Sequence, residues 1–505
     1  MSERAVIVGV GQMRRRPGLD GEWVPLEPSR MVARCLEAAA ADAGRPALVH
    51  EADAVGWIPA IAWGYADPGG AVAAALGRPS PRVAWSCKAG GESGVQVVND
   101  AAQRIAAGEI EIALVGGCEA LYSRSRARKE GVELGWTPGG EDIRYLFEGQ
   151  RPFANESERR HGVALPIYAY PMLENAIRAE ARRSIADHQH RLAKLYARFS
   201  EVATANPFSW FPEKRSEADI EATGEANRMV GFPYPKRMNA IMEVDQAAAA
   251  IVMSVAAADR LGIAPSRWVT VLGGARSVDG WSVSERARLT SSPAYEAAAR
   301  ATMQHAGINA GDVDVFDFYS CFPTVVQFAM RALQLDIDDP RGFTQTGGLA
   351  HHGGPGNAYS MHGVANAVNA LREGRGQVAW VSGLGMTATK HAIVALSTDP
   401  ARIDSSDGGV SELDLPVELR DGPALVDRPE GPAAVESYTV AFDRASRPER
   451  RIFLLRLEDG RRALANGHHT PDEFRALTES EGVGRRGRVT PGSGDAPNVF
   501  TLAGC

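Results

Sequence analysis

Apolar residues recur along this chain in two patterns that alternate over most of its length. Short continuous apolar runs, such as residues 5–11 (AVIVGVG) and 378–381 (VAWV), predict buried strands. Stretches with apolar positions three and four residues apart lie between them and predict amphipathic helices. Strands that are apolar throughout are typical of a parallel sheet covered by helices on both faces, so the pattern predicts a layered α/β core.

One unit of helix and strand occurs twice, with a constant spacing of 266 residues. Residues 101–118 (AAQRIAAGEIEIALVGGC) and 367–384 (AVNALREGRGQVAWVSGL) each show an amphipathic helix, a glycine stop, a short apolar strand and a glycine turn. A second pair, residues 52–60 and 313–321, places an apolar strand after a turn that contains aspartate. The repeat predicts two α/β halves, residues 1–275 and 276–402.

Three segments depart from this rhythm. Residues 119–240 are rich in Arg, Tyr, Trp and Pro, and they predict a lobe inserted into the first half, with helices near 170–204. Residues 403–430 are dense in Asp, Gly and Pro without periodicity, which predicts a linker. Residues 431–505 alternate as short strands with a hairpin turn at Asp459 and Gly460, which predicts a small β-barrel.

The first strand ends in glycines that match a nucleotide-binding loop only in part. Gly9 and Gly11 fit the first two glycines of a GxGxxG motif, but the third position is Arg14. A basic side chain there prevents the close packing of helix on strand that the motif needs. The segment is therefore interpreted as a buried strand followed by a turn.

Composition and charge exclude several classes of protein. The 505 residues are 44% apolar and 23% charged, with a net charge of −7, so nucleic acid and anionic membrane are not expected partners. No apolar run is long enough for a membrane-spanning helix, and the basic cluster follows the first apolar stretch instead of preceding it, so we expect a cytoplasmic protein. The five cysteines form no CxxC pair, so neither disulfides nor a metal site is expected.

Several segments together resemble the thiolase superfamily, specifically its sterol-carrier-type thiolase-like branch with an extra C-terminal OB-like domain. The resemblance spans essentially the whole chain. It implies an α/β fold with a thiolase-like αβαβα five-layer core from two repeated halves, an inserted lobe that covers coenzyme A, and a small C-terminal β-barrel. The segments that carry it are 93–120, 206–211 (NPFSWF), 227–249, 317–327 (DFYSCFPTVVQ) and 346–363 (TGGLAHHGGPGNAYSMHG).

The residues with which thiolases perform catalysis are replaced at all four matching positions. The nucleophilic cysteine of the C-x-S-G segment becomes Gly91, and the histidine of the G-H-P segment becomes Gly354. The second cysteine aligns with Val381, and the asparagine or histidine of the N-E-A-F or H-D-C-F motif becomes Tyr319. The resemblance therefore implies a protein that does not form an acyl-cysteine.

Backbone and phenol groups are the first candidates for the remaining chemistry. Gly91 and Gly383 would present N–H groups from the two halves to one point, as an oxyanion hole for a thioester does; the alternative is that they only turn the chain. Tyr319 follows a predicted strand at a position that faces the pocket in similar proteins. It is a candidate acid or base, and a hydrogen-bonded core tyrosine is the alternative.

Three histidines are candidates to replace the missing base. His351 and His352 follow a glycine turn, and because adjacent side chains on an extended loop point apart, at most one of them is expected to act. His362 follows in a predicted helix, where capping or packing explains it equally well.

Further candidates concern substrate binding. Cys321 coincides with the cysteine of the H-D-C-F motif and is interpreted as a small buried residue that borders the substrate. Lys236 and Arg237 are candidates for contacts with the phosphates of coenzyme A, with a surface basic pair as the alternative. Cys87, four residues before Gly91, is a minor candidate nucleophile.

We therefore expect an acyl-CoA-handling enzyme, either an acyltransferase or a carbon–carbon lyase of the retro-aldol or Claisen type, that acts without an acyl-cysteine. A catalytically silent acyl-CoA or lipid carrier, or a scaffold protein, is the alternative. Coenzyme A thioester is the expected substrate or ligand, with no tightly bound cofactor. The expected assembly is a homodimer or a complex with a partner acyl-CoA enzyme, and the sequence does not choose between them.

Overall fold

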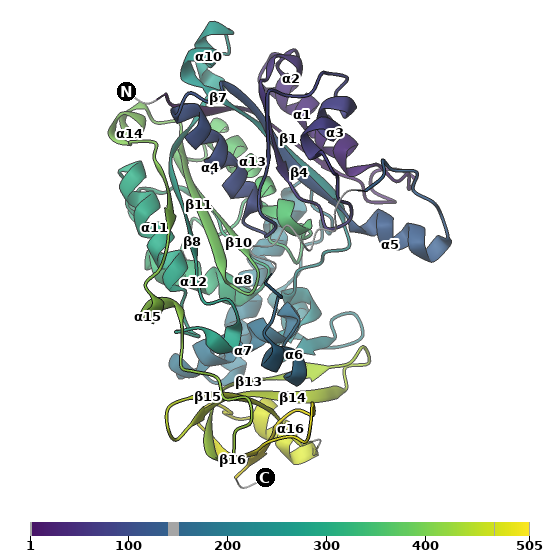
Figure 1. The fold of residues 1–505 in the computed structure, drawn as a ribbon, viewed down its shortest axis with the longest axis vertical. Helices are drawn as coiled ribbons and strands as arrows, with labels where there is room; N and C mark the ends of the chain where they lie inside the picture. Colours follow the sequence, from purple (N-terminus) through teal and green to yellow (C-terminus); the bar gives the residue numbers. More distant parts are fainter. Residues whose placement is uncertain (1–2, 140–150, 469, 504–505) are drawn as a thin grey trace.

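A large mixed sheet forms the body of the protein (Figure 1). The computed structural model describes residues 3–139, 151–468 and 470–503. The order of the strands across the sheet is β3 (Val83–Ser86), β2 (Ala54–Ile58), β4 (Ile112–Ala120), β7 (Asp245–Ser254), β1 (Ala5–Arg14), β8 (Val269–Val278), β11 (Lys390–Ser397), β10 (Val378–Gly385) and β9 (Val315–Asp317). A further strand, β12 (Val410–Leu413), pairs with β8.

The expectation of a parallel sheet is wrong for the centre of the structure. Strands β2, β3 and β4 pair in parallel, as do β9 and β10, but β4, β7, β1, β8, β11 and β10 pair with their successive neighbours in antiparallel fashion. Every residue of β7 is buried although both of its neighbours are antiparallel. Burial on both faces, not strand direction, therefore makes these strands uniformly apolar.

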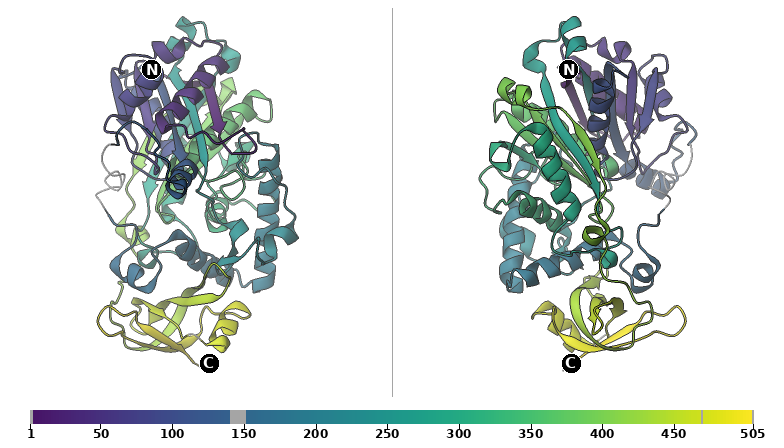
Figure 2. Two further views of the ribbon diagram at one scale, coloured as in Figure 1. Left: turned by 90° about the vertical axis from the view of Figure 1, so that its right-hand side faces the viewer. Right: turned by 60° about the vertical axis from the view of Figure 1, so that its left-hand side comes forward.

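Helices cover both faces of the sheet and fill the space between its two halves. Helices α4 (Ser93–Ala106) and α13 (Tyr359–Arg372) lie between the halves, and both contact strands of each. Helices α1 (Pro28–Asp42) and α3 (Pro68–Ala75) cover the outer face of the first half, and α11 (Pro293–Ala306) and α12 (Pro323–Leu333) that of the second (Figure 2). The five-layer core with two repeated halves is confirmed.

The repeat in the sequence corresponds to a local two-fold relation between α4 and α13. The N–H of Gly94 donates to the hydroxyl of Ser360 at 3.1 Å, and these two residues are 266 positions apart, the spacing of the repeat. A residue contacts its own counterpart only beside the axis that relates the halves. A Cβ atom at Gly94 would lie 2.1 Å from the backbone nitrogen of Met361, so glycine lets the two helices cross closely.

The two glycines of β1 serve helix packing. A Cβ atom at Gly9 would lie 1.9 Å from the carbonyl oxygen of Ala39, and one at Gly11 would lie 2.0 Å from that of Cys35. Both carbonyls belong to α1. The glycines of this strand are therefore explained by the approach of α1 to the sheet.

The inserted lobe consists of helices of different lengths and a two-strand extension. It contains α5 (Leu121–Glu130), α6 (Glu156–His161), α7 (Pro166–Glu180), α8 (Ile185–Ala205), α9 (Glu217–Glu221), β5 (Met229–Gly231) and β6 (Tyr234–Pro235). The helical stretch expected near 170–204 is two helices, because Arg182 adopts a left-handed conformation with φ of 52° and Ser184 caps α8.

A buried carboxylate joins the lobe to the second half of the core. Glu174 in α7 accepts hydrogen bonds from His188 at 2.5 Å, from Thr324 at 2.9 Å and from Gln327 at 2.8 Å, and also from Tyr234. Two of these donors lie in the lobe outside α7, and two lie in α12. The lobe is therefore fixed on the core and its position is well defined.

The segment predicted to be a linker is structured. It holds β12 in the main sheet and α15 (Val417–Arg420), and α14 (Pro400–Ser405) overlaps its start. Two further short helices of the core are α2 (Leu48–Glu51) and α10 (Val255–Arg260). The dense Asp, Gly and Pro content of residues 403–430 therefore marks short elements that the core holds in place.

The C-terminal residues form a closed small β-barrel. Its strands are β13 (Gly431–Phe442), β14 (Pro448–Leu457), β15 (Arg462–Asn466), β17 (Val499–Leu502) and β16 (Arg486–Thr490), and β16 pairs back with β13 to close the ring. Helix α16 (Pro471–Thr478) lies between β15 and β16 in the chain. The lobe extends this sheet, since Gly231 of β5 pairs with Ala441 of β13.

Arg462 fastens the barrel to the core, and we expect its removal to be costly. Its side chain is 1% exposed, donates to the carbonyls of Ser284 and Arg286, and pairs with Glu436 at 2.6 Å. Arg462→Ala removes the buried guanidinium from the Ser284 and Arg286 carbonyls and leaves Glu436 with Arg456 as its remaining cation, so it should lower the free energy of unfolding by about 3 kcal/mol in urea titration. The neighbouring Arg461, 54% exposed, is the control, and an equal loss in Arg461→Ala would contradict this role.

Candidate functional site

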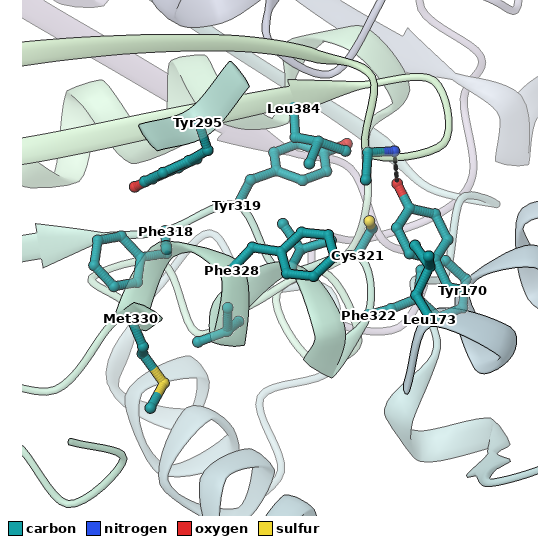
Figure 3. Close-up of a cluster of buried hydrophobic side chains, with 14 of the residues drawn as sticks. Tyr170, Leu173, Tyr295, Phe318, Tyr319, Cys321, Phe322, Phe328, Met330 and Leu384 are labelled. Carbon is teal, nitrogen blue, oxygen red and sulfur yellow. Dashed lines mark hydrogen bonds between the residues drawn. The ribbon is translucent and has the colours of Figure 1, made fainter. Parts of the chain in front are cut away.

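An apolar cavity of about 310 Å³ opens where the two halves meet the lobe. It lies at the start of α4, the end of β9, the turn between β10 and β11, and the first two turns of α7. Figure 3 shows several of the side chains that line it, including Tyr170, Tyr319 and Cys321. Its described lining contains no carboxylate, imidazole or amine. The residues that line it are Ile61, Gly90, Gly91, Phe153, Leu165, Pro166, Ile167, Tyr170, Ala240, Met242, Tyr319, Cys321, Phe322, Leu349, Gly354, Gly356, Asn357, Leu384 and Met386.

Tyr319 occupies the place that a side chain at position 91 would need. A Cβ atom on Gly91 would lie 2.1 Å from the Tyr319 hydroxyl oxygen and 2.4 Å from the carbonyl oxygen of Leu384. No side chain fits at such distances without displacement of its neighbours. The phenol therefore lies where a nucleophile at position 91 would stand.

The Tyr319 hydroxyl group is available to a ligand. Within the described chain it has no hydrogen-bond partner, and its ring contacts Tyr359 edge to face at 5.4 Å. Burial, followed by the nearby Cys321, Tyr359 and Glu92, raises the pKa of Tyr319 well above its ordinary value. The phenol stays protonated at neutral pH, so it acts as a hydrogen-bond donor and not as a base.

Of the two glycines proposed for an oxyanion hole, the structure places Gly91 at the cavity and Gly383 behind it. The carbonyl of Gly91 accepts from the Ser360 hydroxyl at 2.7 Å, and its N–H has no partner in the described residues. Gly383 lies within β10 in register with Ala392 and packs against Glu92. Its neighbour Leu384 lines the cavity instead.

A buried ion pair supports the loop that holds Gly91. Glu92 and Lys390 are fully buried and lie 2.7 Å apart, and Lys390 also donates to the carbonyl of Ala89 at 2.8 Å. A Cβ atom at Gly90 or Gly385 would lie within 2.1 Å of the Glu92 carboxylate, so both glycines make room for it. Burial raises the pKa of Glu92, and the Lys390 ammonium opposes that shift. Lys390 is the first residue of β11, and nothing in the sequence around it indicates that it is buried and paired with Glu92.

Tyr170 holds the turn that forms one wall of the cavity. Its hydroxyl donates to the carbonyl of Met386 at 3.0 Å and accepts from the N–H of Ala388 at 2.8 Å. Both turn residues are non-glycine residues with positive φ, 58° and 54°, a conformation that persists only where neighbours enforce it. Cys321 also lines the cavity, and burial raises the pKa of its thiol to about 12. It is therefore a neutral thiol at physiological pH.

The three histidines lie outside the cavity. His351, His352 and His362 are buried, and none lines it. His352 contacts Ser209 at 3.2 Å and the His362 ring at 4.9 Å, while His362 contacts Gln12 at 2.7 Å. Burial lowers the pKa of His351 to about 4 and that of His352 to about 3, and it also lowers that of His362. All three are neutral imidazoles at physiological pH.

The remaining candidates also lie apart from the cavity lining. The Arg237 side chain donates to the carbonyl of Asp219, and Lys236 is exposed. Cys87 contacts Asp100 at 3.7 Å, and burial raises the pKa of its thiol well above the ordinary value. In the described ranges no group of His, Cys, Asp and Glu side chains has the arrangement of a metal site, and no helix is long and apolar enough to cross a membrane.

Comparisons with known proteins agree with this architecture. A family model for the additional C-terminal domain of thiolase-like protein type 1 matches residues 413–493. An acetyl-CoA acetyltransferase from Syntrophomonas wolfei aligns over 79% of this chain and 100% of its own with a TM-score of 0.56 and 15% identity, which shows the fold alone. The chain thus shares its fold with that acetyltransferase over most of its length.

The family is defined more closely by a second structure. A monomeric SCP2-thiolase-like protein type 1 from Mycobacterium smegmatis is 32% identical over 99% of both chains, with a TM-score of 0.81. The chain belongs to the SCP2-thiolase-like protein type 1 family, as the sequence resemblance indicated. No protein with a curated description matches the sequence.

The crowding at position 91 gives a direct test. Gly91→Ala should lower the free energy of unfolding by about 1 to 3 kcal/mol, because the added methyl group must displace Tyr319. Gly354→Ala is the matched control, since a Cβ atom there meets nothing closer than 3.3 Å. Equal stability of the two variants in urea titration would contradict the placement of Tyr319.

The burial of His352 as a neutral imidazole predicts that the stability of the protein depends on pH. With a folded pKa of about 3 for His352 and an unfolded value of about 6.5, the unfolded state binds the extra proton between these values. The contribution of His352 to the free energy of unfolding is therefore fully present above about pH 6.5. It decreases as the pH falls below that value, because only the unfolded state takes up the proton. Relative to His352→Asn, the wild type should lose about 2 kcal/mol between pH 7 and pH 5 in urea titration.

The control for this experiment is His50→Asn, on the exposed surface. We expect that substitution to change the pH dependence far less. If the difference between wild type and His352→Asn were the same at both pH values, the burial of a neutral imidazole would be refuted.

Proposed function

We propose that this protein is an acyl-thioester enzyme, an acyltransferase or a carbon–carbon lyase of the retro-aldol or Claisen type, that acts without an acyl-cysteine. The observation that carries the proposal is the protonated, unpartnered Tyr319 hydroxyl at an apolar cavity, in the place of a side chain at position 91. An apolar lining suits an acyl chain, and a phenol suits its thioester oxygen.

Both reaction types develop negative charge on the same atom. In acyl transfer the thioester oxygen becomes the oxyanion of a tetrahedral intermediate. In retro-aldol cleavage the electron pair of the broken carbon–carbon bond passes into the thioester, whose oxygen becomes an enolate. Tyr319 O–H and the free N–H of Gly91 would donate to that oxygen, and donors in a dry cavity stabilise such charge strongly.

The neutral cavity limits how the proton moves. Because the described lining offers no carboxylate, imidazole or amine, the proton released by the attacking nucleophile or by the β-hydroxyl group would pass to a water molecule, and water would return a proton to the departing thiolate or to the enolate carbon. Coenzyme A, free or as part of the thioester, would bind as substrate and not as a resident cofactor.

The lack of a carboxylate, imidazole or amine in the described lining also favours a second function, that of a carrier. A cavity whose described residues provide a donor but no base suits binding of an acyl-CoA or lipid without turnover, and the sealed histidines agree with it. Incubation with short, long and steroid-type acyl-CoA, followed by mass spectrometry, separates the two functions. Cleaved or transferred product supports the enzyme, and bound intact thioester supports the carrier.

The assembly is also proposed from the relative. Since the Mycobacterium smegmatis protein is described as monomeric, we infer that this chain is also a monomer and does not form the homodimer, which was one of the two assemblies left open by the sequence.

Tyr319→Phe tests the role of the phenol. On the thioester that the wild type turns over, we expect turnover to fall by about 100 to 1,000-fold, since the donor acts on charge that develops in the transition state. Binding of the same thioester, measured by calorimetry, should change less than about tenfold.

Tyr359→Phe is the matched control, because Tyr359 contacts the Tyr319 ring while its own hydroxyl bonds Thr346 outside the cavity lining. We expect this variant to retain most of the turnover. Equal turnover in Tyr319→Phe and the wild type would remove the phenol from the mechanism.

A further inference from the structure

Helix α5 projects from the side of the first half and is firmly anchored at its first turn (Figure 1). Ser123 donates from its N–H at 3.0 Å and from its hydroxyl at 2.5 Å to the carboxylate of Asp245 in β7. Trp23 donates to the Ser123 hydroxyl at 3.0 Å, and the Arg126 guanidinium lies 4.4 Å from the centre of the Trp23 ring. From residue 128 onward the helix is exposed. It is a rigid element with a free outer end.

The charge of this helix is opposite in sign to that of the whole chain. The protein carries a net charge of −7, yet residues 121–129 contain four cations and no acid. Arg126 pairs with Glu130 at 2.8 Å, whereas Arg124, Arg128 and Lys129 are exposed and have no ion pair in the described chain. Of the four cations, Arg128 and Lys129 in the last turn suit the helix dipole, whereas Arg124 in the first half does not. Helix stability therefore does not explain the whole set.

The helix borders the mouth of the apolar cavity. The Arg124 guanidinium donates to the carbonyl of Ile61 at 3.3 Å, and the Ser125 hydroxyl donates to Glu243 at 2.7 Å. Ile61 and Met242, the neighbour of Glu243, both line the cavity. Met242 is 44% exposed although it is apolar. Exposed methionine beside arginine is a composition typical of protein interfaces.

We propose that α5 and Met242 form the docking surface for an acidic protein that carries an acyl chain as a thioester and exchanges it with the cavity. The proposal rests on the proposed function in one respect, that the cavity accepts an acyl chain. The cations of α5 favour a partner with an acidic surface. Because α5 lies beside the mouth of the cavity, a partner bound there can deliver its acyl chain to the cavity.

The reach of the cations favours a protein over a small thioester. Arg128 and Lys129 lie four and five residues beyond Arg124, about 6 to 8 Å further along the helix. A ligand that enters at Ile61 has no need of these outer cations, whereas a broad acidic surface contacts the whole row. A single short helix gives a small contact area, so the complex should be transient, as exchange requires.

The test measures binding of a purified acidic acyl carrier protein that bears an octanoyl thioester to the full chain by calorimetry. We expect binding to the wild type at about 50 mM salt and a Kd at least about tenfold higher for the double variant R128E/K129E. The difference should shrink at about 0.5 M salt, since exposed charges are screened. The matched control is R486E/R488E, two exposed cations on β16 at the far end of the molecule.

Octanoyl-CoA, titrated into the same proteins, separates this proposal from the proposed function. Equal octanoyl-CoA binding by wild type and R128E/K129E, together with the loss for the carrier protein, supports the docking surface. Failure of the carrier protein to bind, or equal binding by both proteins, overturns it. A matching loss for octanoyl-CoA also overturns it, because α5 would then bind the phosphates of the small thioester. Carrier binding without octanoyl-CoA binding sustains the docking surface and contradicts the proposed acyl-CoA function.

Discussion

The close crossing of α4 and α13 is the constraint on which the remaining structure depends. At this point Gly94 and Ser360, counterparts in the two repeats, share a hydrogen bond, and Ser360 also holds the carbonyl of Gly91. The contact needs a residue without a side chain on α4, because the neighbouring backbone lies where a Cβ atom would be. It fixes how the halves meet, and hence which loops surround the cavity.

The wall of the cavity at position 91 is built from both halves of the core. With glycine at position 91, the space beside the loop is filled by a phenol from the other half of the core. The cavity is lined mainly by apolar groups, and the phenol that faces it can donate a hydrogen bond. The buried Glu92 and Lys390 pair secures the loop from behind, because neither charge can leave without exposing the other to an apolar interior.

The sequence predicted the repeated halves, the inserted lobe and the barrel because these depend on periodicity, which is local. It could not predict the antiparallel centre of the sheet, since β7 and β1 are apolar on both faces whatever their direction. Tyr319 and Gly91 were identified from the family resemblance, and the structure brings them together. His351 and His352 were proposed for the site because they follow a glycine turn, but His352 contacts Ser209 and its neighbour His362 contacts Gln12, outside the cavity lining. Tyr170 carries no such signal, because its role depends on a turn more than 200 residues away.

The strand pairing between the lobe and the barrel has a consequence for synthesis of the chain. Gly231 in β5 pairs with Ala441 in β13, so this edge of the lobe's sheet has no β13 partner until residue 441 has been synthesised and has left the ribosome. Unpaired edges of this kind attract other strands, and late pairings of distant segments form slowly. During translation the nascent lobe therefore passes through a period of exposure that ends only when the barrel folds against it.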